Sequence, residues 1–450
     1  MIQLLRRFFR FLIISDEIRN RLLITLGLLI LYRLVAHVPV PGVNREAIAS
    51  ILSQAGAGQT LFSLLDLLSG GTVSNFSVLA MGVYPYITAQ IILQLLVPII
   101  PSLQARMEED PREGRKWMEK WTYYLALPMA ALNAIGQIRL FQQFAIGQPA
   151  DILNFSLGLN LPTFTTILTM TAGTMFAIWL GELISEFGIR NQGLSLIIFA
   201  GIVAQIPSNV GQLLADESLR IPLIAFLLFL TAATVFVIVY VQEGRRNVPV
   251  MYPGRRVGNR MSMPVKGTLP LMVNMSGMIP LIFAQSLLTF PAVVAQFFIA
   301  SENVTVQSIA FWLQNNFGGI SSTYWIMYFL MVVGFTFFYT DVLFAQQNYG
   351  ENLKRSGAQV PGVTKGVATQ RYLTRVLRRI TMPGALLLGL VAVMPFLVGL
   401  LFPFTGGSQS GLLLVSSAGL LIVVGVVRDT YRSIEAELKL RGYDQALLVR

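Results

Sequence analysis

The sequence has no cysteine and only one histidine, His37, among its 450 residues. The first absence excludes disulfides, thiolate metal sites and a cysteine nucleophile, and the second excludes zinc sites built from several histidines. Charged residues are scarce as well, at 12% of the chain, which is about half of their usual share in soluble domains. The P-loop pattern GxxxxGK[ST] is also missing, so any energy that the protein uses must come from a partner or a gradient.

Apolar residues dominate instead: 54% of the chain is hydrophobic, and the mean hydropathy is +0.65. The apolar runs are too long for the buried helices of a soluble protein, and they predict an all-α membrane protein with ten transmembrane helices. The fifth run is short and is expected to extend past Pro207 toward Leu214. The predicted spans are Leu22–Val38, Phe76–Ile100, Trp121–Ile138, Pro162–Leu180, Leu194–Ile206, Ile221–Val241, Leu269–Phe290, Tyr324–Phe344, Met382–Leu401 and Gly411–Val427.

The basic residues set the orientation of these spans. Arg45, Arg139 and Arg220 lie on one side and Arg33 lies within the first span, whereas all other Lys and Arg residues lie on the opposite side. By the positive-inside rule, this asymmetry places both termini in the cytoplasm. The net charge of +11 also calls for an acidic partner or anionic lipid.

Ten spans divide into two halves of five, which would insert with opposite orientations as an inverted repeat. The N-terminal half is expected at 22–215, the C-terminal half at 216–428 and a cytoplasmic tail at 429–450. Residues 1–14 (MIQLLRRFFRFLII) resemble the start of a signal peptide, but SDEIRNR follows at 15–21, where a small-residue cleavage site would be. We therefore expect a retained, cytoplasmic amphipathic helix there.

A short apolar segment at 60–69 stands out before the second span. Ten helical residues rise only about 15 Å, half of the ~30 Å hydrocarbon core, so the segment can enter a membrane but cannot cross it. Gly70 and Gly71 break it, and the span that follows carries Thr88, Gln90 and Gln94. A half-length insert beside a polar span suggests a cavity within the membrane. A surface-lying helix followed by an ordinary span is the alternative.

The acidic residues nearest the spans do not form a catalytic pair. Glu182, Glu186 and Asp341 lie at span ends, and Asp66 lies in the short segment. Because no two acids share a face at mid-membrane, neither an enzyme nor a metal site is predicted. A transporter coupled to ions usually keeps ionisable groups at that depth.

Branched aliphatic residues recur at helical spacing in two spans. Val83 and Ile87 share one helix face, and so do Ile198 and Ile202. A ring of such residues can close a pore by excluding water. Ordinary helix packing gives the same pattern.

Two loops, 242–268 and 346–380, are long, basic and rich in Gly and Pro. Dense arginine on a protruding loop suits RNA phosphate or an acidic protein surface, although membrane topology alone requires basic loops. On the opposite side, Val306–Phe317 is expected to form an amphipathic surface helix.

Five stretches occur in order along the chain and resemble those of the SecY family, the channel subunits of protein translocases. They are SGGTVSNFSVLAMGVYPYITAQIILQLL (Ser69–Leu96), GELISEFGIRNQGLSLIIFAGIVAQIP (Gly181–Pro207), VNMSGMIPLIFAQSLLTFP (Val273–Pro291), ENLKRSGAQVPGV (Glu351–Val363) and GLLIVVGVVRDT (Gly419–Thr430). The resemblance covers essentially the whole chain. It implies a clamshell of ten helices around an hourglass pore, hinged between spans five and six.

The resemblance also implies roles for individual residues. A lateral gate would open spans two and three against seven and eight, with Asn133 and Asn274 as its polar pair. The pore ring would be Val83, Ile87, Ile198, Ile202, Ile282 and Ile422. The plug would be the segment at 60–70, including Leu61, Phe62, Leu64, Leu65, Asp66, Leu68 and Gly70. Binding of the motor or ribosome would use Arg246, Arg255, Arg256, Arg260, Lys354, Arg355 and Lys365, with Lys365 replacing the arginine that the family often has at Thr364.

The resemblance implies a protein-conducting channel that needs no cofactor. We expect it in the bacterial inner membrane, with the thylakoid as the alternative. It would translocate unfolded secretory proteins that bear signal peptides and release apolar segments sideways into the lipid bilayer. Its partners would be the small membrane subunits SecE and SecG, the motor ATPase SecA and the ribosome. The alternative from a different class is an ion-coupled secondary transporter of small molecules, which shares the inverted-repeat logic.

Overall fold

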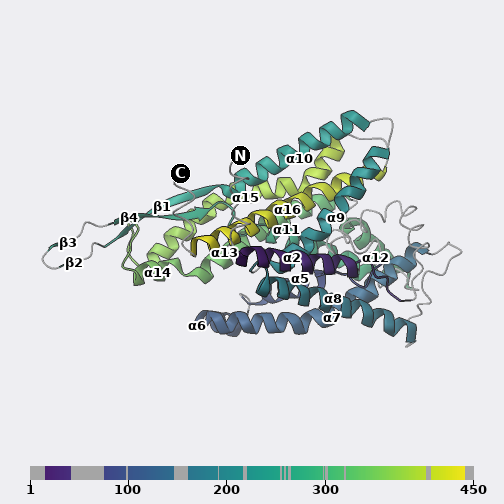
Figure 1. The fold of residues 1–450 in the computed structure, drawn as a ribbon, viewed down its shortest axis with the longest axis horizontal. Coiled ribbons are helices and arrows are strands. Elements are labelled where there is room, and N and C mark those ends of the chain that lie inside the picture. Colours follow the sequence, from purple (N-terminus) through teal and green to yellow (C-terminus); the bar gives the residue numbers. More distant parts are fainter. Residues whose placement is uncertain are drawn as a thin grey trace.

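The computed structural model describes residues 16–41, 76–97, 100–145, 161–190, 192–215, 220–253, 256–257, 260–261, 265–296, 298, 303–318, 321–401 and 407–440. The chain is mostly helical, as predicted, and the helices lie side by side in an elongated bundle (Figure 1). A β-hairpin projects from one end of this bundle (Figure 1). The predicted plug and most of the N-terminal segment 1–21 lie outside the described residues.

The helices differ in length from the predicted spans, mostly by extending beyond them. In the N-terminal part they are α2 (Asp16–Val35), α5 (Tyr84–Leu96), α6 (Pro101–Glu109), α7 (Pro111–Ala145), α8 (Leu161–Phe187) and α9 (Gly193–Ala215). In the C-terminal part they are α10 (Arg220–Glu243), α11 (Ile279–Gln296), α12 (Val304–Phe317), α13 (Ser322–Gln347), α14 (Tyr349–Arg355), α15 (Val367–Leu401) and α16 (Gly407–Leu440). The extension of the fifth span past Pro207 and the surface helix at Val306–Phe317 are confirmed.

Three helical stretches in the described part of the chain are long and apolar enough to cross a membrane. They are Leu161–Phe187, Ser322–Arg355 and Val367–Met394. The bent pair formed by Tyr84–Leu96 and Pro101–Met107 would make a fourth if it is one span. Shorter apolar helices occupy further predicted spans, such as Ile279–Ala295.

The prediction of one continuous helix over Phe76–Ile100 is wrong. Turns occupy 76–83, and α5 covers only Tyr84–Leu96. Gly82 has a φ of 52° and Phe76 a φ of 40°, a region that a right-handed helix does not use. After α5 the chain bends by 99° into α6, which begins at Pro101. Prolines are favoured at such helix starts because the first N–H groups have no partner within the helix.

The prediction of a span over Leu269–Phe290 is also wrong in its first third. Residues 269–272 belong to strand β4 (Val265–Met272), which pairs antiparallel with β1 (Arg245–Tyr252). A turn at 273–278 follows, with Gly277 at a φ of 64°, and α11 begins only at Ile279. The strand pairing outcompetes helix formation because β4 has a partner strand in register, with Leu269 opposite Val248.

The loop at 242–268 is therefore a twisted β-ribbon, which the sequence analysis did not predict. Its tip carries a second short pair, β2 (Arg256–Val257) with β3 (Arg260–Met261). Figure 1 shows this ribbon extending well beyond the helices.

The ribbon packs on the second basic loop, so the two loops form one body. Val248, Val250 and Leu271 of the ribbon share an apolar cluster with Leu353 and Val360 of the second loop. A backbone bridge between Met251 and Gln359 extends the pairing, with N–O distances of 2.8 and 2.9 Å. We call this unit, residues 245–272 with 349–377, the basic body.

Candidate functional site

The six predicted ring residues lie in one apolar cluster at the centre of the bundle. They come from parts of the chain that are far apart in sequence: the N-terminal boundary and first turn of α5, and helices α9, α11 and α16. Their side chains are between 1% and 9% exposed. The residues are Val83, Ile87, Ile198, Ile202, Ile282 and Ile422. Their role as a ring stays a prediction, but the structure brings them together.

A close backbone approach positions the segment that carries Val83. Gly173 in α8 faces the backbone carbonyl of Val78, and a Cβ atom at Gly173 would overlap that carbonyl. Only glycine permits helix α8 to lie this close to the turns at 76–83. These turns set the residue at which α5 begins, and therefore the direction in which Val83 and Ile87 project.

The contact between α5 and α11 contains buried hydroxyl groups and a long hydrogen bond. Tyr84 Oη of α5 donates to the backbone oxygen of Ser286 in α11 over 3.4 Å. Thr88 and Thr289 are buried beside this contact, and each hydroxyl donates to its own helix backbone. The Ser286 hydroxyl itself is buried without a partner among the described residues. We call this contact the polar seam.

Helix α7 contacts the turns that precede α5, through Gln137. Its Nε2 atom donates to the backbone oxygen of Ala80 over 3.5 Å, and its Oε1 atom is buried without a partner among the described residues. Gln137 was not among the predicted site residues, because a single amide near the end of a span resembles ordinary helix packing.

Asn133 and Asn274, the predicted polar pair, each form hydrogen bonds with residues close to them in sequence. Asn133 Nδ2 donates to the backbone oxygen of Met129 within α7 over 2.9 Å. Asn274 Nδ2 donates to the backbone oxygen of Gly277 over 2.9 Å, and Ser276 Oγ donates to Asn274 Oδ1 over 2.9 Å. Asn274 therefore braces the turn that precedes α11, and its pairing with Asn133 stays a prediction.

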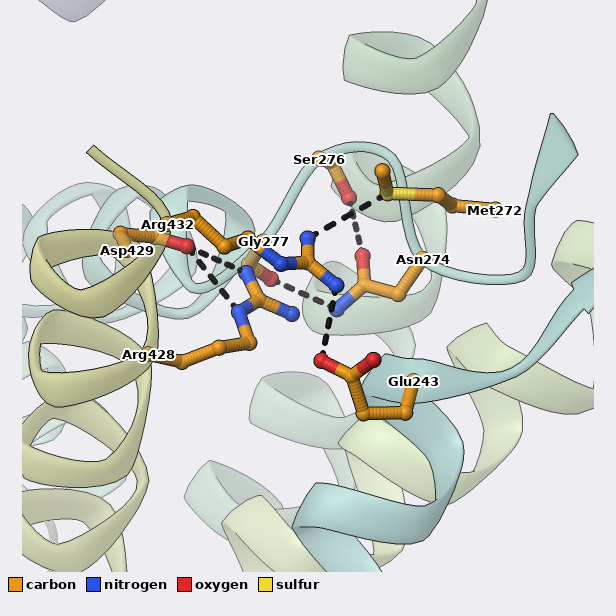
Figure 2. Close-up of polar contacts among 8 residues, drawn as sticks. All are labelled: Glu243, Met272, Asn274, Ser276, Gly277, Arg428, Asp429 and Arg432. Carbon is orange, nitrogen blue, oxygen red and sulfur yellow. Dashed lines mark hydrogen bonds and ion pairs between the residues drawn. The ribbon is translucent and has the colours of Figure 1, made fainter. Parts of the chain in front are cut away.

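Charged residues surround this turn, as Figure 2 shows. Arg428 in the C-terminal half of α16 contacts the carboxylate of its neighbour Asp429, at 2.8 Å from Nη2 and 3.0 Å from Nε. Arg432, one turn further on, forms an ion pair of 2.8 Å with Glu243 at the end of α10. Its Nη1 atom also lies 3.4 Å from Met272 Sδ. We call this cluster the turn clasp.

The turn within the clasp depends on Gly277, whose positive φ disfavours any L side chain. A Cβ atom at this position would make only an ordinary van der Waals contact, 3.6 Å from Arg428 Nη2. The clasp joins the end of α10, the turn before α11 and the C-terminal half of α16. In the sequence, Arg428 and Arg432 stand out only as charges of the tail, since nothing in their spacing reveals partners that lie so far away.

The predicted docking residues lie on the basic body where the structure describes them. Arg246 is exposed on β1, and Lys365 is exposed before α15. Lys354 and Arg355 lie 3.9 and 3.5 Å from Glu351 in α14, and both remain largely exposed. Among the other predicted docking residues, the backbones of Arg256 and Arg260 belong to β2 and β3, and Arg255 lies outside the described residues.

The fold and the site together define a class: a helical membrane protein whose apolar centre is bordered by a polar seam and capped by a basic body. The SecY family model matches residues 77–431. Curated relatives named protein translocase subunit SecY include those of Streptomyces scabiei, at 35% identity over 96% of this chain and 97% of the relative, and Chlamydia muridarum, at 38% over 96% of both. The relative from Aquifex aeolicus is 38% identical over 95% of this chain and 96% of its own length. This chain belongs to the SecY family.

Two solved structures share the fold over 96% of both chains. One is described as a protein-conducting channel, with a TM-score of 0.61 and 17% identity. The other concerns the plug domain of SecY and the closed state of the translocation channel, with a TM-score of 0.62 and 18% identity.

Proposed function

We propose that this chain is the channel subunit of a protein translocase. It would pass unfolded secretory proteins across a membrane and release their apolar segments sideways into the lipid. The observation that carries this proposal is the large apolar cluster, which contains six predicted ring residues from four separate elements. Such a ring can fit closely around an extended polypeptide and exclude water when none is present. Family membership adds support, because the relatives are named for protein translocation.

The polar seam would be the lateral gate in this proposal. Helices α5 and α7 stand on one side and α11 and α13 on the other, and Asn133 and Asn274 belong to those two sides. The long bond from Tyr84 to Ser286 and the unpartnered hydroxyl of Ser286 support a contact that separates at low cost. A neutral hydrogen bond contributes only about 1 kcal/mol.

The rest of the predicted architecture also belongs to this proposal. Ten spans in two inverted halves, 22–215 and 216–428, would surround the pore, with the plug at 60–70 on the outer side. Both termini and the basic body would face the cytoplasm of a bacterial inner membrane, in agreement with the distribution of Lys and Arg. The basic body would bind SecA or the ribosome, and SecE and SecG would complete the assembly. The exposed positions of Arg246, Lys354 and Lys365 support such docking.

Crosslinking of a stalled secretory chain tests the proposal directly. The sequence has no cysteine, so Val83→Cys and Ile198→Cys each give a single reactive thiol. We expect both positions to crosslink to a stalled substrate. Leu168→Cys, which is 56% exposed on α8, is the control and should not react with it. Absence of crosslinks at both ring positions, together with uptake of a small solute, would instead favour an ion-coupled transporter.

A further inference from the structure

A basic groove lies between α13 and α15, away from the central cluster. Its volume is about 750 Å³, within the usual range for ligand sites. Four arginines of α15 line it, and Phe337 of α13 and Met382 of α15 add apolar surface. The arginines are Arg371, Arg375, Arg378 and Arg379.

The spacing of these arginines leaves positive charge uncompensated. Arg371, Arg375 and Arg379 follow one another at intervals of four residues, and like charges at that spacing destabilise a helix. All three are exposed, and no carboxylate partner occurs for them among the described residues. None of the residues that line the groove is acidic. A bound anion would remove this repulsion.

Arg378 differs from the other three because it is already paired. Its Nη2 atom lies 2.9 Å from Asp341 Oδ2 of α13, and its Nε atom lies 3.1 and 3.2 Å from the two carboxylate oxygens. This fork-like contact fixes α13 beside α15. Arg378 therefore forms a wall of the groove, and the other three arginines remain available for a ligand.

The groove also has an apolar part. Met382 is 57% exposed and lies inside Val367–Met394, one of the stretches that can cross a membrane. Phe337 lies inside the stretch Ser322–Arg355, another such candidate. Met382 is also the first residue of the predicted span Met382–Leu401, and the four arginines precede it. The groove thus joins a cluster of arginines to apolar side chains of two predicted spans. A ligand that satisfies both parts has an anionic head and an apolar tail.

We propose that this groove binds an acidic phospholipid. Its headgroup phosphate would contact Arg371, Arg375 and Arg379, and an acyl chain would run along Phe337 and Met382. Nucleic acid or an acidic protein would match the charge but not the apolar part. The bound lipid would fill the space between α13 and α15 and hold the two helices together from the membrane side.

Native mass spectrometry of the full chain can count retained lipids. The protein is purified in detergent and titrated with phosphatidylglycerol, with phosphatidylcholine and inorganic phosphate in parallel. The test variant carries Arg371→Gln, Arg375→Gln and Arg379→Gln. Each basic residue near a membrane surface contributes about 1 kcal/mol to anionic lipid binding, so we expect affinity for phosphatidylglycerol to fall about a hundredfold.

A matched control removes the same number of charges elsewhere. Lys354→Gln, Arg355→Gln and Lys365→Gln change exposed residues of the basic body outside the groove. This control should keep its phosphatidylglycerol affinity within about twofold. Equal losses in both variants would mean general attraction to charge and would overturn the proposal. The proposal would also be overturned if the unmodified chain retained phosphatidylcholine as well as it retains phosphatidylglycerol.

Two further outcomes would also overturn it. If inorganic phosphate bound as tightly as phosphatidylglycerol, the apolar part of the groove would contribute nothing to binding. A groove variant that loses ribosome binding but keeps its lipid would assign the arginines to RNA. Substitution of all three arginines by lysine keeps the charge, and this variant should retain most of the lipid, which separates ligand binding from a failure to fold.

Discussion

Helix α11 makes two contacts of opposite character, one with α13 and one with α5. Towards α13 it packs through rings: Phe283 meets Phe335 and Tyr339 edge-on, with centroids 6.3 and 5.8 Å apart. Towards α5 it accepts a long hydrogen bond, from the Tyr84 hydroxyl to the backbone oxygen of Ser286, and buried hydroxyl groups lie beside this bond. Aromatic packing is lost in full when its partners separate, whereas hydroxyl groups can exchange one partner for water or for another chain.

The difference indicates which helices move together. If the polar seam is the gate, α11 and α13 separate from α5 as one unit.

Phe283→Ala should destabilise the protein most, by about 3 kcal/mol, because it leaves a cavity between α11 and α13. Thermal unfolding of the purified chain in detergent measures the loss. Phe283→Leu, which keeps much of the volume, is the control and should lose less than half as much. If both variants unfold like the parent, the ring contact does not hold the two helices together.

Ile282→Asn should cost less, about 1–3 kcal/mol, because it places an amide among apolar side chains. Its main effect should be on function: a looser ring should pass ions and admit secretory proteins with defective signal peptides. Ion conductance across vesicles and secretion of such a mutant substrate measure the two effects. Leu330→Asn, on the exposed face of α13, is the control. Unchanged leak and secretion in Ile282→Asn would contradict the assignment of the ring.

Tyr84→Phe removes the hydroxyl of the polar seam and should change stability by no more than about 1 kcal/mol. Secretion should respond more than stability, since the closed seam loses its bond between helices. Secretion of a wild-type substrate and thermal unfolding are measured on the same preparation. A loss of stability as large as that of Phe283→Ala would show that the two contacts of α11 do not differ in character.

The smallest effect is expected for the ion pair between Arg432 and Glu243. Both side chains are partly exposed, at 32% and 52%, so the pair should contribute about 0.2–1 kcal/mol. A double-mutant cycle with Arg432→Gln and Glu243→Gln measures the coupling, which should weaken as salt is raised. A coupling energy of zero at low salt would show that this ion pair does not stabilise the turn clasp.

Sequence patterns predicted the helical character of the chain because long apolar runs are local signals. The same patterns failed at 76–83 and 265–278, where apolar residues form turns and a strand. Hydropathy does not distinguish a helix from a strand that has a partner, and β4 has one in β1. The turn at 76–83 depends on a contact with Gly173, which lies far away in sequence.

The candidate site, like the fold, was predicted from the sequence only in part. The family motifs pointed to the six ring residues, which the structure brings together in one cluster. Gln137 and the turn clasp went unpredicted, because their partners come from elements distant in sequence. The groove of arginines was visible only as part of a basic loop, since Phe337 of its apolar part comes from α13, which is separate from that loop.

The β-ribbon has a mechanical consequence. Strand β4 ends at Met272, and after one braced turn the chain becomes α11 at Ile279. Because only the six residues of this turn separate β4 from α11, we expect a displacement of the β-ribbon to be passed on to α11.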